Sequence, residues 1–125
     1  SLTENLETVR GSGLNYVLSY AISGIISCIK KERNIKIHIS VMILVIICGF
    51  IFHLSTTEWL ICILLFALVI SLELVNTAIE AVVDLCSPNY HELAKYAKDV
   101  AAGSVLISAI ASVVIGLIIF VPKLF

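Results

Sequence analysis

The most informative stretch of the sequence is Leu72-Glu73-Leu74-Val75-Asn76-Thr77-Ala78-Ile79-Glu80-Ala81-Val82-Val83-Asp84-Leu85. It continues, without a Gly or Pro, from an apolar run that starts at Trp59. At about 100° per residue, its polar side chains fall at roughly 0°, 300°, 340° and 20° around a helix axis, in the order Glu73, Asn76, Glu80, Asp84. Carboxylates on an apolar helix are costly in lipid, so we expect this polar stripe to face protein, water or a metal ion.

The composition indicates a membrane protein. Of the 125 residues, 60% are hydrophobic and only 14% are charged, and the mean hydropathy is +1.10. A soluble chain of this length could not bury so much apolar surface, so we expect an all-α, multi-pass membrane protein. The net charge is −1 and the basic residues form no long patch. No nucleic-acid partner is therefore expected.

The apolar pattern predicts one domain, residues 1–125, with four helices. Apolar residues at spacings of three and four predict an amphipathic helix over about 14–30, lying flat in the membrane interface, with packing only on other helices as the alternative. Membrane helices are expected at about 35–54, 58–85 and 90–122, since about 20 residues span the hydrocarbon layer. Seven of the eight Lys and Arg residues precede the first span or lie between the second and third. The amino terminus and the 86–99 loop are therefore predicted to be cytoplasmic.

Acidic groups from separate helices are expected at one depth. If Trp59 marks the outer interface, Glu73 lies about 21 Å and Glu80 about 31 Å inward along the axis. Asp84 lies slightly further, and three more polar groups flank the other spans at the same boundary: Glu32, Lys98 and Asp99. Clustered carboxylates suit Mg²⁺, and a nearby Lys suits phosphate. Phosphoryl transfer from a nucleotide to a lipid alcohol needs these groups, with Glu73 as proton acceptor.

Other interpretations of these residues stay open at this point. Glu73 could carry protons in a small oligomeric transporter. Asn76 could be an interhelical hydrogen-bonding residue, and Glu80 and Asp84 could form a solvated face. Lys95 is expected to be a surface residue, and His38 is expected at the end of a membrane span. No GxxxxGK[ST] loop is present, which excludes a soluble P-loop kinase.

The residues also resemble a known family. The 73–84 stretch, Tyr90-His91-Glu92-Leu93 and Ala97-Lys98-Asp99 closely resemble the signature of the small prokaryotic diacylglycerol kinase family, and the likeness covers roughly residues 14–125. The Gram-positive branch of this family acts mainly as undecaprenol kinase. The resemblance implies a homotrimer in the bacterial inner membrane, with a surface helix and three membrane helices per subunit and active sites shared between neighbours. It also implies an ATP- and Mg²⁺-dependent lipid kinase, with undecaprenol favoured over diacylglycerol as substrate.

The resemblance assigns roles to residues of this sequence. Glu73 matches the catalytic base that takes the proton of the lipid hydroxyl, and Glu32 and Glu80 match the metal-coordinating acids. The positions around ATP, in addition to these two acids, are Tyr20, Asn76, Asp84, Asn89, Tyr90, His91, Lys98 and Asp99. A basic residue usual near position 13 is replaced by Gly13, which removes one expected phosphate contact.

Overall fold

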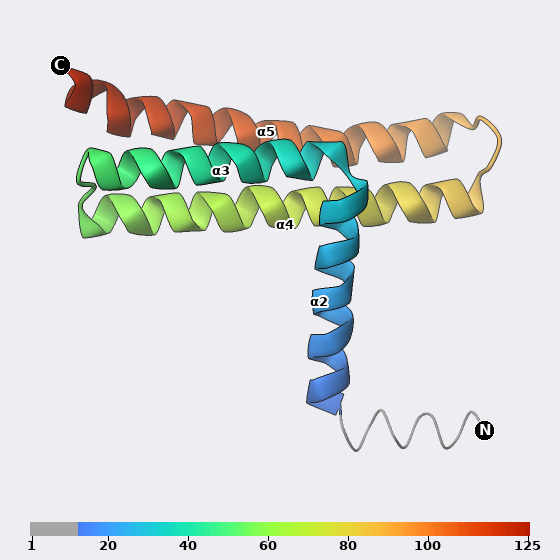
Figure 1. Ribbon diagram of the computed structural model, residues 1–125. Helices are drawn as coiled ribbons and strands as arrows, with labels where there is room; N and C mark the ends of the chain where they lie inside the picture. The colour runs from blue at the N-terminus through green and yellow to red at the C-terminus, as the bar shows by residue number, and fades with distance from the viewer. Residues whose placement is uncertain (1–12) are drawn as a thin grey trace. The chain divides into compact units, whose positions relative to one another are not determined.

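The computed structural model describes residues 13–125, and within that range the secondary structure is entirely helical. The helices are α2 (Gly13–Lys31), α3 (Arg33–Ile51), α4 (Thr56–Cys86) and α5 (Glu92–Leu124) (Figure 1). The last three are long and apolar enough to cross a membrane. The predicted all-α fold with three membrane-length helices is therefore confirmed. Arg10, which contributed to the predicted orientation, lies outside the described residues.

Helix α2 belongs to a compact unit that ends at Glu32, while α3, α4 and α5 form a second unit. Lys30 and Lys31 occupy the last turn of α2, where positive charge is favourable against the helix dipole. The backbone N–H of Glu32 still donates to the carbonyl of Cys28 over 2.9 Å. The predicted amphipathic segment is thus helical, and its position in the membrane interface stays a prediction.

Helix α3 ends three residues earlier than the first predicted span, at Ile51. His53 has a φ of 54°, a left-handed conformation that a helix cannot continue through. The N–H of Leu54 then donates to the carbonyl of Gly49 over 3.1 Å, which closes the turn. The remaining 19 residues are about 28 Å long, close to the thickness of the hydrocarbon layer.

Helix α4 begins with a capping box. The Ser55 hydroxyl accepts from the N–H of Glu58 over 3.2 Å, and the N–H of Ser55 donates to the Glu58 carboxylate over 3.0 Å. These contacts satisfy two groups that every helix start leaves unpaired. The helix ends at Cys86, just before Pro88, whose ring disfavours a continuing helix. Its 31 residues extend about 46 Å, so α4 is longer than the hydrocarbon layer.

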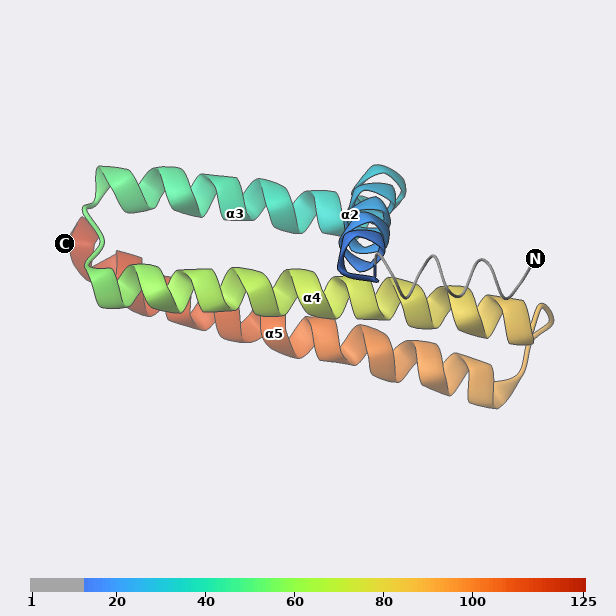
Figure 2. The same cartoon turned by 90° about the horizontal axis from the view of Figure 1, so that it is seen from below.

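Helix α4 is the central helix of the second unit, because it packs against both α3 and α5 (Figure 2). A buried cluster lies at the end where α3 turns into α4, and it contains Leu54, Cys62 and Ile119. At the opposite end, α4 and α5 continue past the start of α3 to the 87–91 loop that joins them (Figure 1). The predicted polar stripe lies on this second half of α4.

Candidate active site

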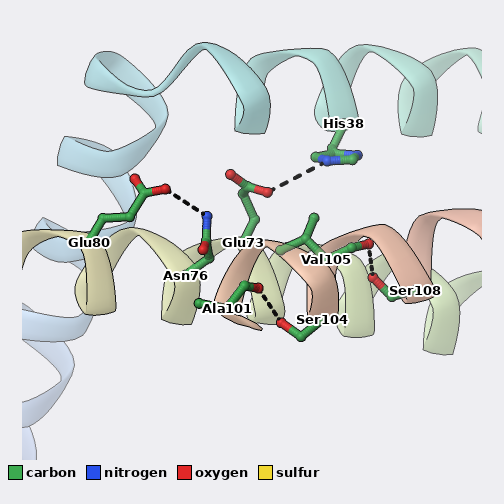
Figure 3. A network of polar contacts seen from close by, with 8 residues as sticks. All are labelled: His38, Glu73, Asn76, Glu80, Ala101, Ser104, Val105 and Ser108. Carbon is green, nitrogen blue, oxygen red and sulfur yellow. Dashed lines mark hydrogen bonds and ion pairs between the residues drawn. The ribbon is translucent and has the colours of Figure 1, made fainter. Parts of the chain in front are cut away.

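The polar stripe of α4 is buried at one end and exposed at the other. The side chains of Glu73 and Asn76 are among the few buried polar groups, with residue exposures of 2% and 5%. Glu80 is half-buried and Asp84 is exposed. The Asn76 amide Nδ2 donates to Glu80 Oε1 over 3.3 Å (Figure 3). The stripe therefore leads from a buried carboxylate to a solvated one along a single helix face.

Glu73 lies between helices α4 and α3. Its Oε2 is 3.7 Å from Nε2 of His38, on α3 (Figure 3). A nearly buried carboxylate is costly unless donors or positive charge compensate it, and the imidazole of His38 is one polar group near Glu73. The sequence predicted that Glu73 lies deeper in the membrane than the other acids of the stripe, and that depth stays a prediction.

Sequence reasoning assigned His38 only to the end of a membrane span and missed this contact. A signal was present in the chain, because α3 and α4 form an antiparallel hairpin that turns at residues 52–55. Counting outward from the turn places His38 within about one helical turn of the level of Glu73. The facing side chains depend on helix rotation, which the apolar run of α3 does not specify.

Asn76 presents a buried acceptor without a donor. Its Oδ1 is buried and has no hydrogen-bond partner, whereas buried amide oxygens in proteins are almost always paired. The nearest turns of α5 satisfy their own hydroxyls: Ser104 donates to the carbonyl of Ala101 and Ser108 to that of Val105 (Figure 3). The amide turns Nδ2 toward Glu80, so its unpaired Oδ1 points away from the Glu80 carboxylate (Figure 3). The Glu80 carboxylate is the hard oxygen ligand here that suits a cation such as Mg²⁺.

No group of three or more His, Cys, Asp or Glu side chains within residues 13–125 is arranged to hold a metal ion. Such a group is not required for Mg²⁺, which proteins commonly hold through one or two carboxylates, with substrate phosphates and water completing the shell. Glu80 therefore fits the ion as part of a site. Glu32, the other predicted ligand, and Tyr20 lie in the first compact unit. Their roles stay predictions.

A polar cavity of about 300 Å³ lies at the end of α4, under the 87–91 loop and the first turns of α5. It brings together most of the predicted nucleotide residues, namely Asp84, Asn89, Tyr90, His91, Lys98 and Asp99. Asn76 and Glu80 are not among its lining residues and lie one to two turns along α4 from Asp84. The cavity is at the lower end of the size range of small-molecule sites.

Two ion pairs fix the charges of this polar cavity. Lys98 Nζ is 2.5 Å from Asp84 Oδ1, which ties α5 to α4. Lys95 Nζ is 2.5 Å from Asp99 Oδ2 within α5. Sequence reasoning treated Lys95 as a surface residue, but its side chain also lines the cavity. The cavity thus offers two ammonium groups to an anion, each able to exchange its carboxylate partner for a phosphate.

The 87–91 loop is held by local hydrogen bonds. The Ser87 hydroxyl donates to the carbonyl of Asn89 over 2.8 Å. His91 caps α5, because its Nδ1 accepts from the N–H of Leu93 over 3.0 Å. The three predicted loop residues, Asn89 to His91, are therefore carried on an ordered turn, and His91 uses one ring nitrogen for the cap.

The fold is that of a small multi-pass membrane protein with three membrane-length helices. A polar face of the central helix runs from a buried carboxylate toward the polar cavity at one end of that helix. A family model described as prokaryotic diacylglycerol kinase matches residues 19–120. The chain belongs to this family and is a lipid kinase. This finding favours the enzyme over the transporter that the stripe alone also allowed.

Proteins that are similar to most of the chain are also lipid kinases by name. An undecaprenol kinase of Bacillus subtilis is 50% identical over 105 residues, which are 84% of this chain and 85% of the relative. A diacylglycerol kinase of Synechocystis is 43% identical over 106 residues, 84% of this chain and 61% of the relative. A diacylglycerol kinase of Haemophilus influenzae is 32% identical over 113 residues, 87% and 96% of the two chains.

Proposed function

We propose that this lipid kinase transfers the γ-phosphoryl group of ATP, with Mg²⁺, to the hydroxyl of a membrane lipid alcohol, and that undecaprenol is preferred over diacylglycerol. The observation that carries the proposal is the position of Glu73. It is a carboxylate only 2% exposed, on the same helix face as the groups that lead to the polar cavity. The preference for undecaprenol is supported by the 50% identity to the Bacillus subtilis undecaprenol kinase.

In this proposal, Glu73 is the general base. The lipid hydroxyl oxygen attacks the γ-phosphorus while its proton passes to the Glu73 carboxylate. The bond from the γ-phosphorus to the bridging oxygen breaks, and ADP leaves with the electron pair. A base buried beside lipid can reach an alcohol that stays in the membrane. The transition state is stabilised mostly by the positioning of the reacting groups and by electrostatic interactions.

The nucleotide occupies the polar cavity at the other end of the stripe. Lys98 and Lys95 give up their carboxylate partners and bind phosphate oxygens. The loop residues Asn89, Tyr90 and His91 surround the nucleoside, with Tyr20, Asp84 and Asp99 completing the contacts. Glu80 and Glu32 would hold Mg²⁺, which would supply positive charge to the phosphate oxygens, and Asn76 would contact the nucleotide.

The assembly is a homotrimer of the bacterial inner membrane, with active sites shared between neighbouring subunits and facing the cytoplasm. Support for an assembly comes from the described helices, whose most apolar windows are only 11% to 22% buried within one chain. Support for the orientation comes from the excess of Lys and Arg at the end of the helices that carries the polar cavity.

A lipid phosphorylation assay tests the proposed function. The purified chain is mixed with γ-labelled ATP, Mg²⁺ and either undecaprenol or diacylglycerol in detergent micelles. We expect label in an organic-soluble lipid phosphate, a higher kcat/KM with undecaprenol, and no product when EDTA removes the metal. Equal or higher kcat/KM with diacylglycerol would overturn the preference, and absence of product with both lipids would overturn the proposed function.

A further inference from the structure

We propose that His38 is a positioning residue for Glu73: its Nε2 holds the Glu73 carboxylate in the orientation that accepts the proton of the lipid hydroxyl. This inference rests on the proposed function, because it assigns His38 to the same reaction. Within the second compact unit, it adds a residue of α3 to a site otherwise built from α4, the 87–91 loop and α5.

The contact crosses between two helices. His38 Nε2 lies 3.7 Å from Glu73 Oε2, and the side chains are 24% and 2% exposed. Figure 3 shows the two side chains pointing toward each other across the space between α3 and α4. The separation is longer than a hydrogen bond. Contacts of catalytic groups are often long before substrate binds and shorten in the reactive complex.

The surroundings make this contact effective. His38 lines an apolar cavity of about 520 Å³ between α3, α4 and α5, whose other lining residues are almost all aliphatic or aromatic. An electrostatic contact beside such a wall is poorly screened. A donor on Nε2 therefore stabilises and orients the carboxylate more strongly than the same pair would in water.

The Glu73 side chain has several rotatable bonds, and each contact to it restricts the orientation of its carboxylate. An unrestrained carboxylate would lose side-chain entropy each time it adopted the reactive orientation. His38 approaches Oε2, and the other carboxylate oxygen lies on the side away from the imidazole (Figure 3). The histidine thus biases one oxygen toward α3 and leaves the proton to be received on the opposite side.

The proposed role of His38 is separate from those of Asn76 and Glu80, the residues proposed to contact the nucleotide and the metal ion. Asn76 and Glu80 are hydrogen-bonded to each other and lie about one and two turns further along α4 than Glu73. Removal of the imidazole should therefore lower kcat without a matching change in the requirement for ATP or Mg²⁺. This separation distinguishes a positioning residue from a nucleotide or metal ligand.

Two substitutions of similar size isolate the donor. His38→Leu keeps a side chain that fills space but removes the N–H, while His38→Gln restores an amide N–H at a similar reach. We expect His38→Leu to lower kcat about 10- to 100-fold, the range that misplacement of a catalytic group produces. His38→Gln should recover most of this loss, and both variants should keep the wild-type KM for ATP. His53→Asn is the control, because His53 is exposed and its φ of 54° is compatible with Asn.

A double substitution supplies the second measurement. If His38 acts through Glu73, His38→Leu should cause no further loss of turnover in a Glu73→Gln background. Independent losses that multiply in the double variant would overturn the proposal, as would a His38→Leu variant with wild-type kcat. Equal losses in His38→Leu and His38→Gln would assign His38 a packing role and also overturn it.

The activity of the wild-type protein distinguishes a failure of the His38 proposal from a failure of the proposed function. Wild-type turnover with a silent His38→Leu substitution overturns only the positioning role. Absence of wild-type turnover with every lipid alcohol overturns the proposed function and the positioning role together. The thermal midpoint of each purified variant is measured alongside, and a kcat loss that follows a lowered midpoint in both His38 variants counts against the proposal.

Discussion

At the scale of single residues, the polar stripe of α4 divides into a buried and a solvated part. Glu73 and Asn76 are nearly inaccessible, whereas Asp84 reaches the polar cavity and pairs with Lys98. In the proposed function, Glu73 meets a partner that enters from the membrane, and Asp84 meets one that enters from water. This division by solvent access is the basis for assigning proton transfer to Glu73 and nucleotide contacts to the exposed end.

We predict that Glu73→Gln loses turnover while ATP binding largely survives. The amide is nearly isosteric with the carboxylate but cannot accept the hydroxyl proton, so kcat should fall by about 100-fold or more. ATP affinity is measured by titration of the purified variant in the presence of Mg²⁺. Equal losses of kcat and of ATP affinity would contradict the assignment of Glu73 as base.

We also predict that Glu80→Gln raises the Mg²⁺ concentration needed for half-maximal activity, by at least about tenfold, because one anionic oxygen ligand is lost. The measurement is a metal titration of lipid phosphorylation at fixed ATP. The matched control is Glu58→Gln at the other end of α4, where a Gln preserves the capping box. An unchanged metal requirement in Glu80→Gln would refute its role as ligand.

At the scale of helices, the sequence predicted the helical fold class and the number of membrane-length helices correctly, but it predicted the ends of the helices less accurately. Helix α4 starts at Thr56, two residues before the predicted start at 58, because a capping box makes Ser55 the N-cap. The end of α3 could not be placed in the same way, since the left-handed conformation of His53 is not encoded by a Gly or Asn. The stripe itself was predictable from helical periodicity alone. Its partner His38 was not, because facing contacts depend on helix rotation.

The close packing of α3 on α4 gives a prediction at this scale. A Cβ at Gly49 would lie 2.5 Å from Cη2 of Trp59 and 3.0 Å from Cδ1 of Leu54. Gly49→Ala should therefore displace the indole at a cost of about 1–3 kcal/mol, which outweighs the gain of about 0.5–1 kcal/mol from Ala in a helix. We expect a lower thermal midpoint in detergent.

The control for Gly49→Ala is Gly116→Ala on α5, where an added Cβ meets no atom within 4 Å. Within the chain, the substitution changes only the helix propensity at that position, which is higher for Ala than for Gly. The thermal midpoint should therefore be unchanged or slightly raised. A midpoint that falls less in Gly49→Ala than in Gly116→Ala would show that the Trp59 ring moves aside without cost.

At the scale of the whole molecule, one chain leaves most of its apolar surface uncovered. Large apolar side chains are exposed along all four described helices, and only lipid or further copies of the chain can cover them. Composition was sufficient to predict this property. The relation between Glu32 and the α4 stripe was not predictable in the same way, because counting residues along the helices predicts one membrane depth for both without fixing their lateral separation.

The proposed homotrimer with shared sites makes a quantitative prediction. Suppose that Glu32 of one subunit meets Glu80 of its neighbour. Glu32→Gln and Glu80→Gln chains, each inactive alone, are mixed in equal amounts and allowed to assemble. A site is intact only when the first subunit keeps Glu32 and the next keeps Glu80. With equal amounts of the two chains, the probability that a given site is intact is one half times one half. Activity should therefore recover to about a quarter of the wild-type value.

A mixture of Glu73→Gln and Glu80→Gln chains is the matched control. Both residues lie on one face of α4 in the same chain, so no assembly of these two variants contains an α4 with both carboxylates, and no activity should return. The recovery of about a quarter is expected for the unfractionated mixture. Mixed complexes isolated through two different affinity tags contain no homotrimers and should reach about a third of the wild-type value, because each mixed trimer has one intact site of three. The control mixture is isolated in the same way. Absence of recovery in the Glu32→Gln and Glu80→Gln mixture would mean that each chain builds its own metal site. The shared-site proposal would then be wrong, while the assignments of Glu32 and Glu80 as ligands would remain testable by metal titration in single chains.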